Sequence, residues 1–352
     1  ATLAATVTAA ALAATAAAPA PATAATTATA AAAVTAATIA TTSPAAAIHA
    51  LLNKRDPRGA LGWIAVSLTF PYFGPLLYYV FGINRVRIRA KQLDQSAQHG
   101  LSARARGVDS GAIRHGDAVP SNFSGLVTAA DELTGAPLVA GNAVQVLRNG
   151  EQAYPAMLSA IESATRFIYM TTYIFETNKV GKHFMKALAD AVERGVDVRV
   201  LLDGFGEYYA WPRRRAGRRL KRRGVRVGRF LAPRLLPPSL RLNLRNHRKI
   251  LVVDGEQAFT GGMNIGDRHY VESGRKRRRV EDLHFGLRGP VVRQIEEVFL
   301  GDWAFTTGQQ TELSAYTDSD VGSALCRAVE DGPTEDADRL ATLMVAAVAS
   351  AR

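Results

Sequence analysis

The sequence has little cysteine, and its first 47 residues have almost no large side chains. Cys326 is the single cysteine among 352 residues, which excludes an intrachain disulfide framework and a cysteine-rich zinc site. Residues 1–47 are almost entirely Ala and Thr with a few prolines, so they have little apolar surface to offset the entropy of ordering. We expect no globular fold in that segment, and a reducing environment for the rest.

Acidic residues are also fewer than basic ones. The chain has 31 Asp and Glu against 43 Lys and Arg, a formal charge of +12, which favours an anionic partner. Basic residues cluster in RRRAGRRLKRR (213–223) and RKRRR (275–279). A lipid surface is favoured over nucleic acid because an apolar segment accompanies these clusters, while a solvated surface is the ordinary alternative.

That apolar segment covers residues 59–84, which contain no charged side chain. About 20 apolar residues suffice to cross a bilayer as a helix, so the segment predicts one transmembrane helix within a membrane leader over 48–92. A buried core helix is the alternative, because Pro71 and Pro75 each remove a helix donor. Basic residues flank both ends, which leaves the membrane orientation open. Residues 93–142 have the composition of a polar linker.

A catalytic-type domain is expected over residues 143–310, where short apolar runs alternate with amphipathic patterns. Strands are predicted at 166–175, 196–203, 225–231, 249–254 and 258–262, and helices at 181–195 and 291–305. This alternation predicts an α/β fold, with helices packed on a mixed sheet as a sandwich.

The stretch NHRKILVVDGEQAFTGGMN (246–264) carries the chemistry. His247 and Lys249 are two residues apart, so on an extended chain both side chains project from one face and reach one phosphate. A neutral imidazole can attack phosphorus while an ammonium group neutralises the charge that grows on the oxygens. A lone H-x-K is usually a solvated strand face, but the full spacing through to the final Asn rarely occurs by chance.

The other residues of the stretch are assigned supporting roles. Asp254 is suited to fixing an imidazole tautomer rather than to attack. Gly261 and Gly262 let the backbone come close to a ligand, and Asn264 offers an amide donor for phosphate oxygens. His284 alternates toward the site, although a structural role is favoured for it. The histidines show no metal-ligand spacing, so neither a metal nor a cofactor is expected.

This motif resembles the signature of the phospholipase D superfamily, H-x-K-x4-D followed by a Gly-rich turn and Asn. The closer resemblance is to bacterial cardiolipin synthases, and it covers roughly residues 48–352. It is carried by the apolar leader, by VRVLLDGFG (198–206), by the motif itself and by DLHFGLRGPVVRQIEEVFLGDWAF (282–305).

The resemblance implies a fold of the phospholipase D type and metal-free phosphatidyl transfer, with phosphatidylglycerol as the anionic substrate. One motif histidine would form a phosphohistidine, and a second would protonate the departing alcohol and then activate the acceptor. His247, Lys249, Asp254 and Asn264 would form half of such a site. Which histidine is the nucleophile stays open, as does hydrolysis against transfer. The implied location is the inner membrane of a bacterium, with the catalytic domain on the cytoplasmic side.

A partial internal repeat suggests where the other half begins. AIESA (160–164) recurs as AVASA (347–351), each ending a helical run that follows a short strand and a Gly-containing turn. Residues 311–352 are therefore expected to open a second, truncated domain, and the chain to be a fragment. The alternatives are a single-motif phosphodiesterase or nuclease that completes its site as a homodimer, and a non-catalytic basic membrane protein.

Overall fold

The computed structural model describes residues 42–54, 57–83, 119, 123–207, 215–232, 246–272, 279–314, 321–330 and 339–350. They belong to two compact units, 1–83 and 84–352, which are considered one at a time. Most of the Ala/Thr segment, most of the predicted linker and part of each basic cluster lie outside the described residues.

The first unit is a set of short helices. Residues 42–53 are helical, and α3 (Pro57–Thr69), α4 (Phe73–Leu77) and the π-helical turn η1 (Tyr78–Gly82) follow. The expected single helix over 59–84 is thus corrected: α3 ends before Pro71, which has no N–H to donate and disfavours helical geometry in the residue ahead of it. No helix in the described part of the chain is both long enough and apolar enough to cross a membrane.

Close packing joins the two sides of this break. A Cβ on Gly74 would lie 2.6 Å from the Cα atom of Ser67, so glycine allows α4 to approach α3. A small core surrounds Tyr78, whose hydroxyl lies 2.7 Å from Nδ1 of His49. Many large apolar side chains of the unit are nevertheless exposed: Ile48, Leu51, Leu52, Leu61, Leu68, Phe70, Tyr72, Phe73, Leu76, Leu77, Tyr79 and Phe81.

The second unit is built on a mixed sheet that has eight strands within the described residues, in the order β4-β3-β2-β5-β6-β7-β1-β8. The strands are β1 (Val139–Arg148), β2 (Phe167–Thr172), β3 (Asp197–Asp203), β4 (Arg226–Phe230), β5 (Ile250–Val253), β6 (Gln257–Gly261), β7 (Leu283–Arg288) and β8 (Ala324–Cys326). Strands β2, β3 and β4 run parallel, and the remaining pairs are antiparallel.

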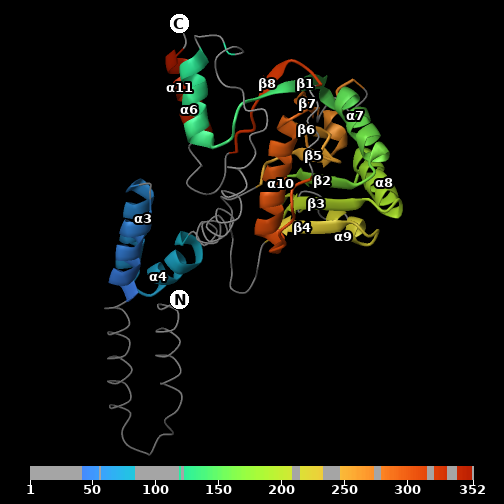
Figure 1. The fold of residues 1–352 in the computed structure, drawn as a ribbon. Helices are drawn as coiled ribbons and strands as arrows, with labels where there is room; N and C mark the ends of the chain where they lie inside the picture. The colour runs from blue at the N-terminus through green and yellow to red at the C-terminus, as the bar shows by residue number, and fades with distance from the viewer. Residues whose placement is uncertain are drawn as a thin grey trace, which may run out of the picture. The chain divides into compact units, whose positions relative to one another are not determined.

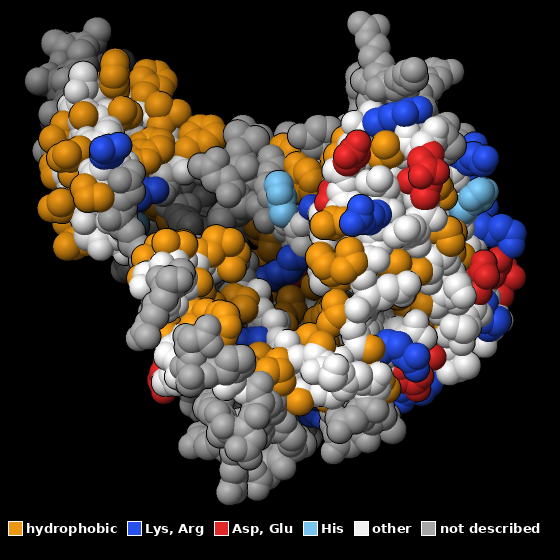
Figure 2. All heavy atoms as spheres, turned by 90° about the horizontal axis from the view of Figure 1, so that it is seen from above, with side chains coloured by type: hydrophobic (Ala, Val, Ile, Leu, Met, Phe, Trp, Pro, Cys, Tyr) orange, Lys and Arg blue, Asp and Glu red, His pale blue; other side chains and the backbone are white. Residues whose placement is uncertain are grey.

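Helices cover both faces of the sheet (Figure 1). One face carries α7 (Asn149–Ser163), α8 (Lys179–Glu193) and α9 (Ala216–Lys221), and the other carries α10 (Val291–Thr307). The strands supply apolar residues to both layers: in β5, Leu251 and Val253 pack under α7 and α8, while Ile250 and Val252 pack under α10. Charged side chains of both signs are interspersed over the visible outer surface of this unit (right side of Figure 2). The predicted α/β mixed-sheet sandwich is confirmed.

The outer edge of the sheet joins distant parts of the chain. Strand β8 pairs antiparallel with β1, and farther along the chain α11 (Arg339–Ser350) packs against α6 (Ser124–Thr134). Asn142 is fully buried at this edge, where its amide nitrogen donates to the carbonyl oxygens of Val139 and Ala324 at 2.8 and 3.1 Å. Its carbonyl oxygen accepts from the N–H of Val291, the first residue of α10, at 2.8 Å. The domain boundary at residue 310 stays a prediction.

Asn142→Ala should lower the free energy of unfolding by about 2–4 kcal/mol, because it leaves buried backbone groups of β1, β8 and α10 without partners. Urea unfolding followed by circular dichroism measures the change. The matched control is Gln145→Ala, an exposed position on the same strand, which should stay within about 0.5 kcal/mol of wild type. Equal losses in the two variants would contradict this role for Asn142.

Candidate active site

His247 and Lys249 lie on extended chain immediately before β5. His247 is exposed, and its ring packs against Tyr173 with 4.3 Å between ring centroids. The ammonium group of Lys249 donates to the backbone carbonyl of His247 at 2.6 Å and lies 5.8 Å from the centre of the Tyr173 ring. The structure therefore brings the imidazole and the ammonium group to one place.

The residues on either side of His247 are anchored in the protein interior. The N–H of Asn246 donates to Asp203 at 3.1 Å, and its side-chain amide donates to Asp302 of α10 at 2.7 Å. Arg248 forms ion pairs with Asp302 and, at 2.6 Å, with Glu330. These contacts fix the backbone at His247 while its ring faces outward. The sequence analysis assigned no role to Asp203 or Asp302. The signal for them is an acidic residue that follows an apolar run, as in VLLD (200–203) and LGDW (300–303).

The side chain of Lys249 is partly buried. Burial lowers its pKa below the usual lysine value, and the carboxylate of Asp282 opposes that shift. Asp282 precedes β7 and lies against the glycine pair: a Cβ on Gly262 would be 2.6 Å from its Cγ atom. Asp282 is thus a further acidic neighbour of the site, and the DLHF pattern of the sequence does not reveal it.

The glycine pair and Asn264 occupy the end of β6 and the turn after it. Gly261 has φ +153°, and a Cβ there would lie 2.5 Å from the carbonyl oxygen of Leu283, so the observed need for glycine is close approach to β7. The carbonyl oxygen of the Asn264 side chain accepts from the N–H of Ile174 at 3.0 Å. Its side-chain amide nitrogen makes no hydrogen bond to the described residues, which leaves that donor available to a ligand.

Asp254 lies at the opposite end of β5 from His247. Its carboxylate accepts backbone hydrogen bonds from Thr165, Arg166 and Phe167, each at 2.8 Å, and one from the Thr165 hydroxyl at 3.0 Å. Burial alone would raise its pKa, but these donors outweigh that effect and hold the pKa below the usual aspartate value. The expected contact with an imidazole is not what this geometry shows, because the carboxylate fastens the β5–β6 turn to the start of β2.

Two further histidines lie behind Lys249. His284 on β7 is 1% exposed, neither of its ring nitrogens has a hydrogen-bond partner among the described residues, and burial lowers its pKa to about 4. Together with Lys249 it lines a small internal cavity. Nε2 of His269 accepts from the N–H of Asn264 at 3.3 Å. His269 and His284 are therefore buried supports of the site.

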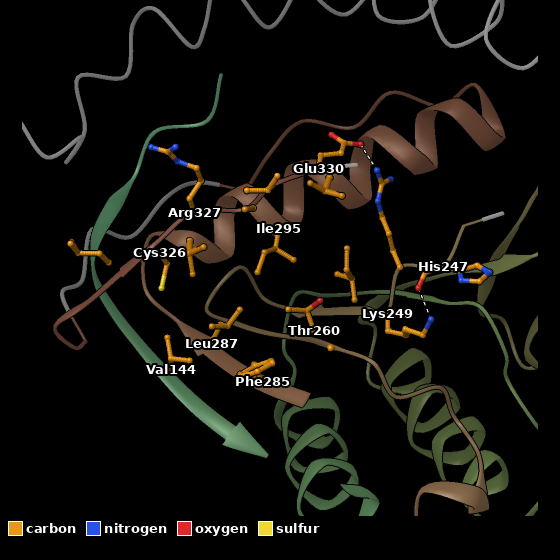
Figure 3. A pocket seen from close by; sticks show the side chains of 18 residues that line it. Val144, His247, Lys249, Thr260, Phe285, Leu287, Ile295, Cys326, Arg327 and Glu330 are labelled. Atoms are coloured by element: carbon orange, nitrogen blue, oxygen red, sulfur yellow. Dashed lines mark hydrogen bonds and ion pairs between the residues drawn. The ribbon is translucent and has the colours of Figure 1, made fainter. Parts of the chain in front are cut away.

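A cavity of about 630 Å³ opens beside the His247–Lys249 pair (Figure 3). In the close view His247 and Lys249 lie at one end, while Val144 and Cys326 lie toward the other. No group of three or more His, Cys, Asp or Glu side chains that suits a metal ion occurs in the part of the chain that the structure describes.

Two family models match the chain. Residues 157–303 match "Cardiolipin synthase, PLD-like domain", and residues 43–82 match "Phospholipase D-nuclease N-terminal". The first match spans β2 to α10 and includes every residue assigned above to the motif. These residues form a phospholipase D-like domain. The recognition of this superfamily from the sequence is confirmed.

Curated relatives agree with this assignment. Cardiolipin synthase A of Pseudomonas aeruginosa is 34% identical over 297 residues, covering 82% of this chain and 59% of the relative. Cardiolipin synthase A of Pseudomonas syringae pv. syringae is 31% identical over 312 residues, covering 87% of this chain and 64% of the relative. The chain thus spans about three fifths of the length of these relatives. Among solved structures, Nuc from Salmonella typhimurium is similar at 23% identity and a TM-score of 0.36, covering 48% of this chain and 99% of Nuc.

Asp282→Asn should lower the pKa of Lys249 further, since it removes the nearby negative charge that favours the ammonium form. Carbon-13 NMR of lysine labelled at Cε, assigned with Lys249→Arg, measures this pKa directly. Glu281→Gln is the matched control, because it removes an exposed neighbouring carboxylate. An unchanged Lys249 pKa in Asp282→Asn would show that Asp282 does not act on the ammonium group.

His284→Met should reduce the acid sensitivity of the domain. Because the folded-state pKa of His284 is about 4 and the ordinary value is 6.5, the unfolded chain takes up the proton first and stability falls as the pH drops through that window. The variant lacks this loss, which amounts to up to about 3 kcal/mol. Urea unfolding between these pH values tests it, with the exposed His183→Met as control; parallel pH profiles for the two variants would refute it.

Proposed function

We propose that this chain provides the first catalytic half of a membrane-bound phosphatidyltransferase that makes cardiolipin from phosphatidylglycerol. The observation that carries the proposal is the placement of His247 and Lys249 together at the end of a largely apolar cavity, within a domain that matches the cardiolipin synthase model. An imidazole beside an ammonium group suits a phosphodiester, and apolar walls suit a lipid. The names of the relatives point to the same reaction.

In the proposed mechanism His247 is one of two histidines. One imidazole attacks phosphorus, the bond from phosphorus to the glycerol oxygen breaks, and the other histidine gives its proton to the departing glycerol. The hydroxyl of a second phosphatidylglycerol then attacks the phosphohistidine, its proton passes to that second histidine, and the P–N bond breaks. Lys249 and the amide of Asn264 stabilise the oxygens of phosphorus as charge grows on them.

The role of Asp254 in this proposal is to position the motif strand. Its carboxylate holds β5 against β2 through Thr165, Arg166 and Phe167, and His247 lies at the other end of that strand. A shift of β5 along β2 would move His247 and Lys249 together relative to Asn264, whose side chain is bonded to Ile174 just after β2. Asp254 thereby acts on the chemistry through the backbone.

The second histidine is proposed to come from a second motif. The sequence holds H-x-K once, at His247, whereas the described residues after α10 form β8 and α11, the strand and helix that the internal repeat predicts for a second half. A second copy of this chain is the competing source, and it would make the protein a homodimeric phosphodiesterase.

Membrane binding is assigned to the first unit. Its exposed Leu, Phe, Tyr and Ile side chains form more apolar surface than a small set of helices in water requires. Burial of such surface in a lipid interface would hold the enzyme at its substrate. Attraction of the basic clusters at 213–223 and 275–279 to anionic headgroups would add to this binding. The proposed location is the bacterial inner membrane.

The test is transfer and cleavage by the purified chain and by its His247→Ala variant, with radiolabelled phosphatidylglycerol in liposomes and with plasmid DNA. We expect cardiolipin to form when a segment with a second H-x-K-x4-D motif is co-expressed. His247→Ala should reduce the rate by at least about a thousandfold, since it removes a nucleophile or a general acid.

The matched control is His183→Ala, an exposed histidine on α8, which should keep full activity. DNA cleavage by the chain alone that depends on His247 would instead favour the homodimeric phosphodiesterase. Activity on neither substrate, even with the co-expressed segment, would leave the non-catalytic membrane protein as the remaining reading, and activity unaffected by His247→Ala would contradict the role of His247.

A further inference from the structure

We propose that the cavity beside His247 and Lys249 binds one acyl chain of the phospholipid whose phosphate these two residues hold. The inference rests on the proposed function and adds to it a lipid-tail site with named walls. It predicts that the protein recognises the tail and the phosphate of one substrate together.

The position of the cavity is the first argument. Its polar end is formed by His247, Arg248 and Lys249, and from there it runs along the α10 face of the sheet toward Val144 and Cys326 (Figure 3). A phosphate held at the polar end would therefore direct the rest of its molecule into the cavity or out to solvent. The volume of about 630 Å³ lies within the roughly 300–1,000 Å³ typical of small-ligand sites.

The chemistry of the walls is the second argument. Strands β1 and β7 contribute Val144, Phe285 and Leu287, and helix α10 contributes Val291, Ile295 and Val298. The segment at β8 closes the remaining side with Leu325, Cys326 and Ala328. Thr260 adds one hydroxyl to this lining, whereas the nine side chains named here are apolar or, in Cys326, only weakly polar. So few hydrogen-bonding groups favour hydrocarbon over a sugar, a peptide or a nucleotide base.

The charged side chains of the lining are paired or lie at the phosphate-binding end. Arg248 forms ion pairs with Asp302 and with Glu330, and Arg327, next to Cys326, forms one with Asp131. The ammonium group of Lys249 lies beside His247 at the phosphate-binding end. A ligand that matches this distribution has an anionic head and an apolar tail. A second copy of the chain, or a second domain laid over the opening, is the competing occupant, and the experiment separates it from lipid.

The experiment measures binding to the 352-residue chain by calorimetry. The ligands are phosphatidylglycerols with two hexanoyl, heptanoyl or octanoyl chains, kept below their micellar concentrations. Glycerophosphoglycerol serves as the probe that has the phosphodiester but no tail. If one tail enters the cavity, each added methylene on that tail should tighten binding about fourfold.

Two valines on β1 provide the variant and its control. Val144 and Val146 are 44% and 51% exposed, and of the two Val144 lines the cavity. Val144→Asp should abolish the chain-length dependence and leave the affinity for glycerophosphoglycerol unchanged, because it places a carboxylate on the wall. Val146→Asp should bind like wild type, and matching unfolding midpoints would exclude misfolding as the cause.

Each contrary result has one meaning. Equal chain-length dependence in Val144→Asp and Val146→Asp would overturn the tail site. A wild-type affinity that does not grow with tail length would overturn it as well, and would favour another part of the protein as the occupant of the cavity. The proposed function survives either result if Lys249→Ala abolishes binding of glycerophosphoglycerol. If Lys249→Ala binds glycerophosphoglycerol normally, or the wild type does not bind it, the proposed function and the tail site both fail.

Discussion

The arrangement of the site depends on carboxylates that hold both ends of the short central strand β5. At one end Asp254 accepts the backbone N–H groups of Arg166 and Phe167, where β2 begins, and at the other Asp302 binds the side chains of Asn246 and Arg248. His247 lies between those two anchored residues. The strand cannot slip along its neighbours without breaking buried, charge-assisted hydrogen bonds, which are among the strongest in proteins. The backbone at His247 is thereby held on both sides, although its ring is exposed.

This arrangement gives the motif spacing a physical meaning. The four residues between Lys249 and Asp254 are the four residues of β5, and all four are buried between the two helical layers. One residue fewer or more would turn the strand's apolar side chains to the wrong layers, because neighbouring residues on a strand face opposite sides. Lys249 and Asp254 therefore lie at opposite ends of β5. Lys249 lies beside His247, whereas Asp254 binds the backbone at the start of β2.

Much of this could be predicted from the sequence, and what failed has identifiable causes. Strong β-branched and apolar runs gave β2, β3 and β5 to within a few residues, and the motif located His247 and Lys249. The single leader helix failed because apolar length was weighed above Pro71, which ends α3. Asp254 was assigned to an imidazole although the predicted strand over 249–254 already separates it from His247, and the backbone donors that it binds come from a different strand, β2.

Other features lie beyond one-dimensional patterns. Asp282 and Asp302 look like ordinary acidic residues in the sequence. Asp282 acts on the pKa of Lys249, and Asp302 forms an ion pair with Arg248. Each partner is more than thirty residues away along the chain, so only the folded sheet brings them together. The cavity is similar: its walls come from β1, β7, α10 and the β8 segment. Of these elements the sequence analysis gave a range only for α10, and their convergence depends on strand order, which local propensity does not encode.

One ion pair joins the cavity wall to the segment that carries His247 and Lys249. Glu330, which follows the β8 segment in the cavity wall, forms an ion pair with Arg248, the residue between His247 and Lys249. In the proposed tail site, a ligand packed against this segment would lie next to the ion pair that anchors the residue after His247. Binding energy from a part of the substrate that does not react is useful in catalysis when it orients the groups that do. The ion pair of Glu330 with Arg248 offers a direct route for that transfer, because one side chain lies in the wall and the other within the motif.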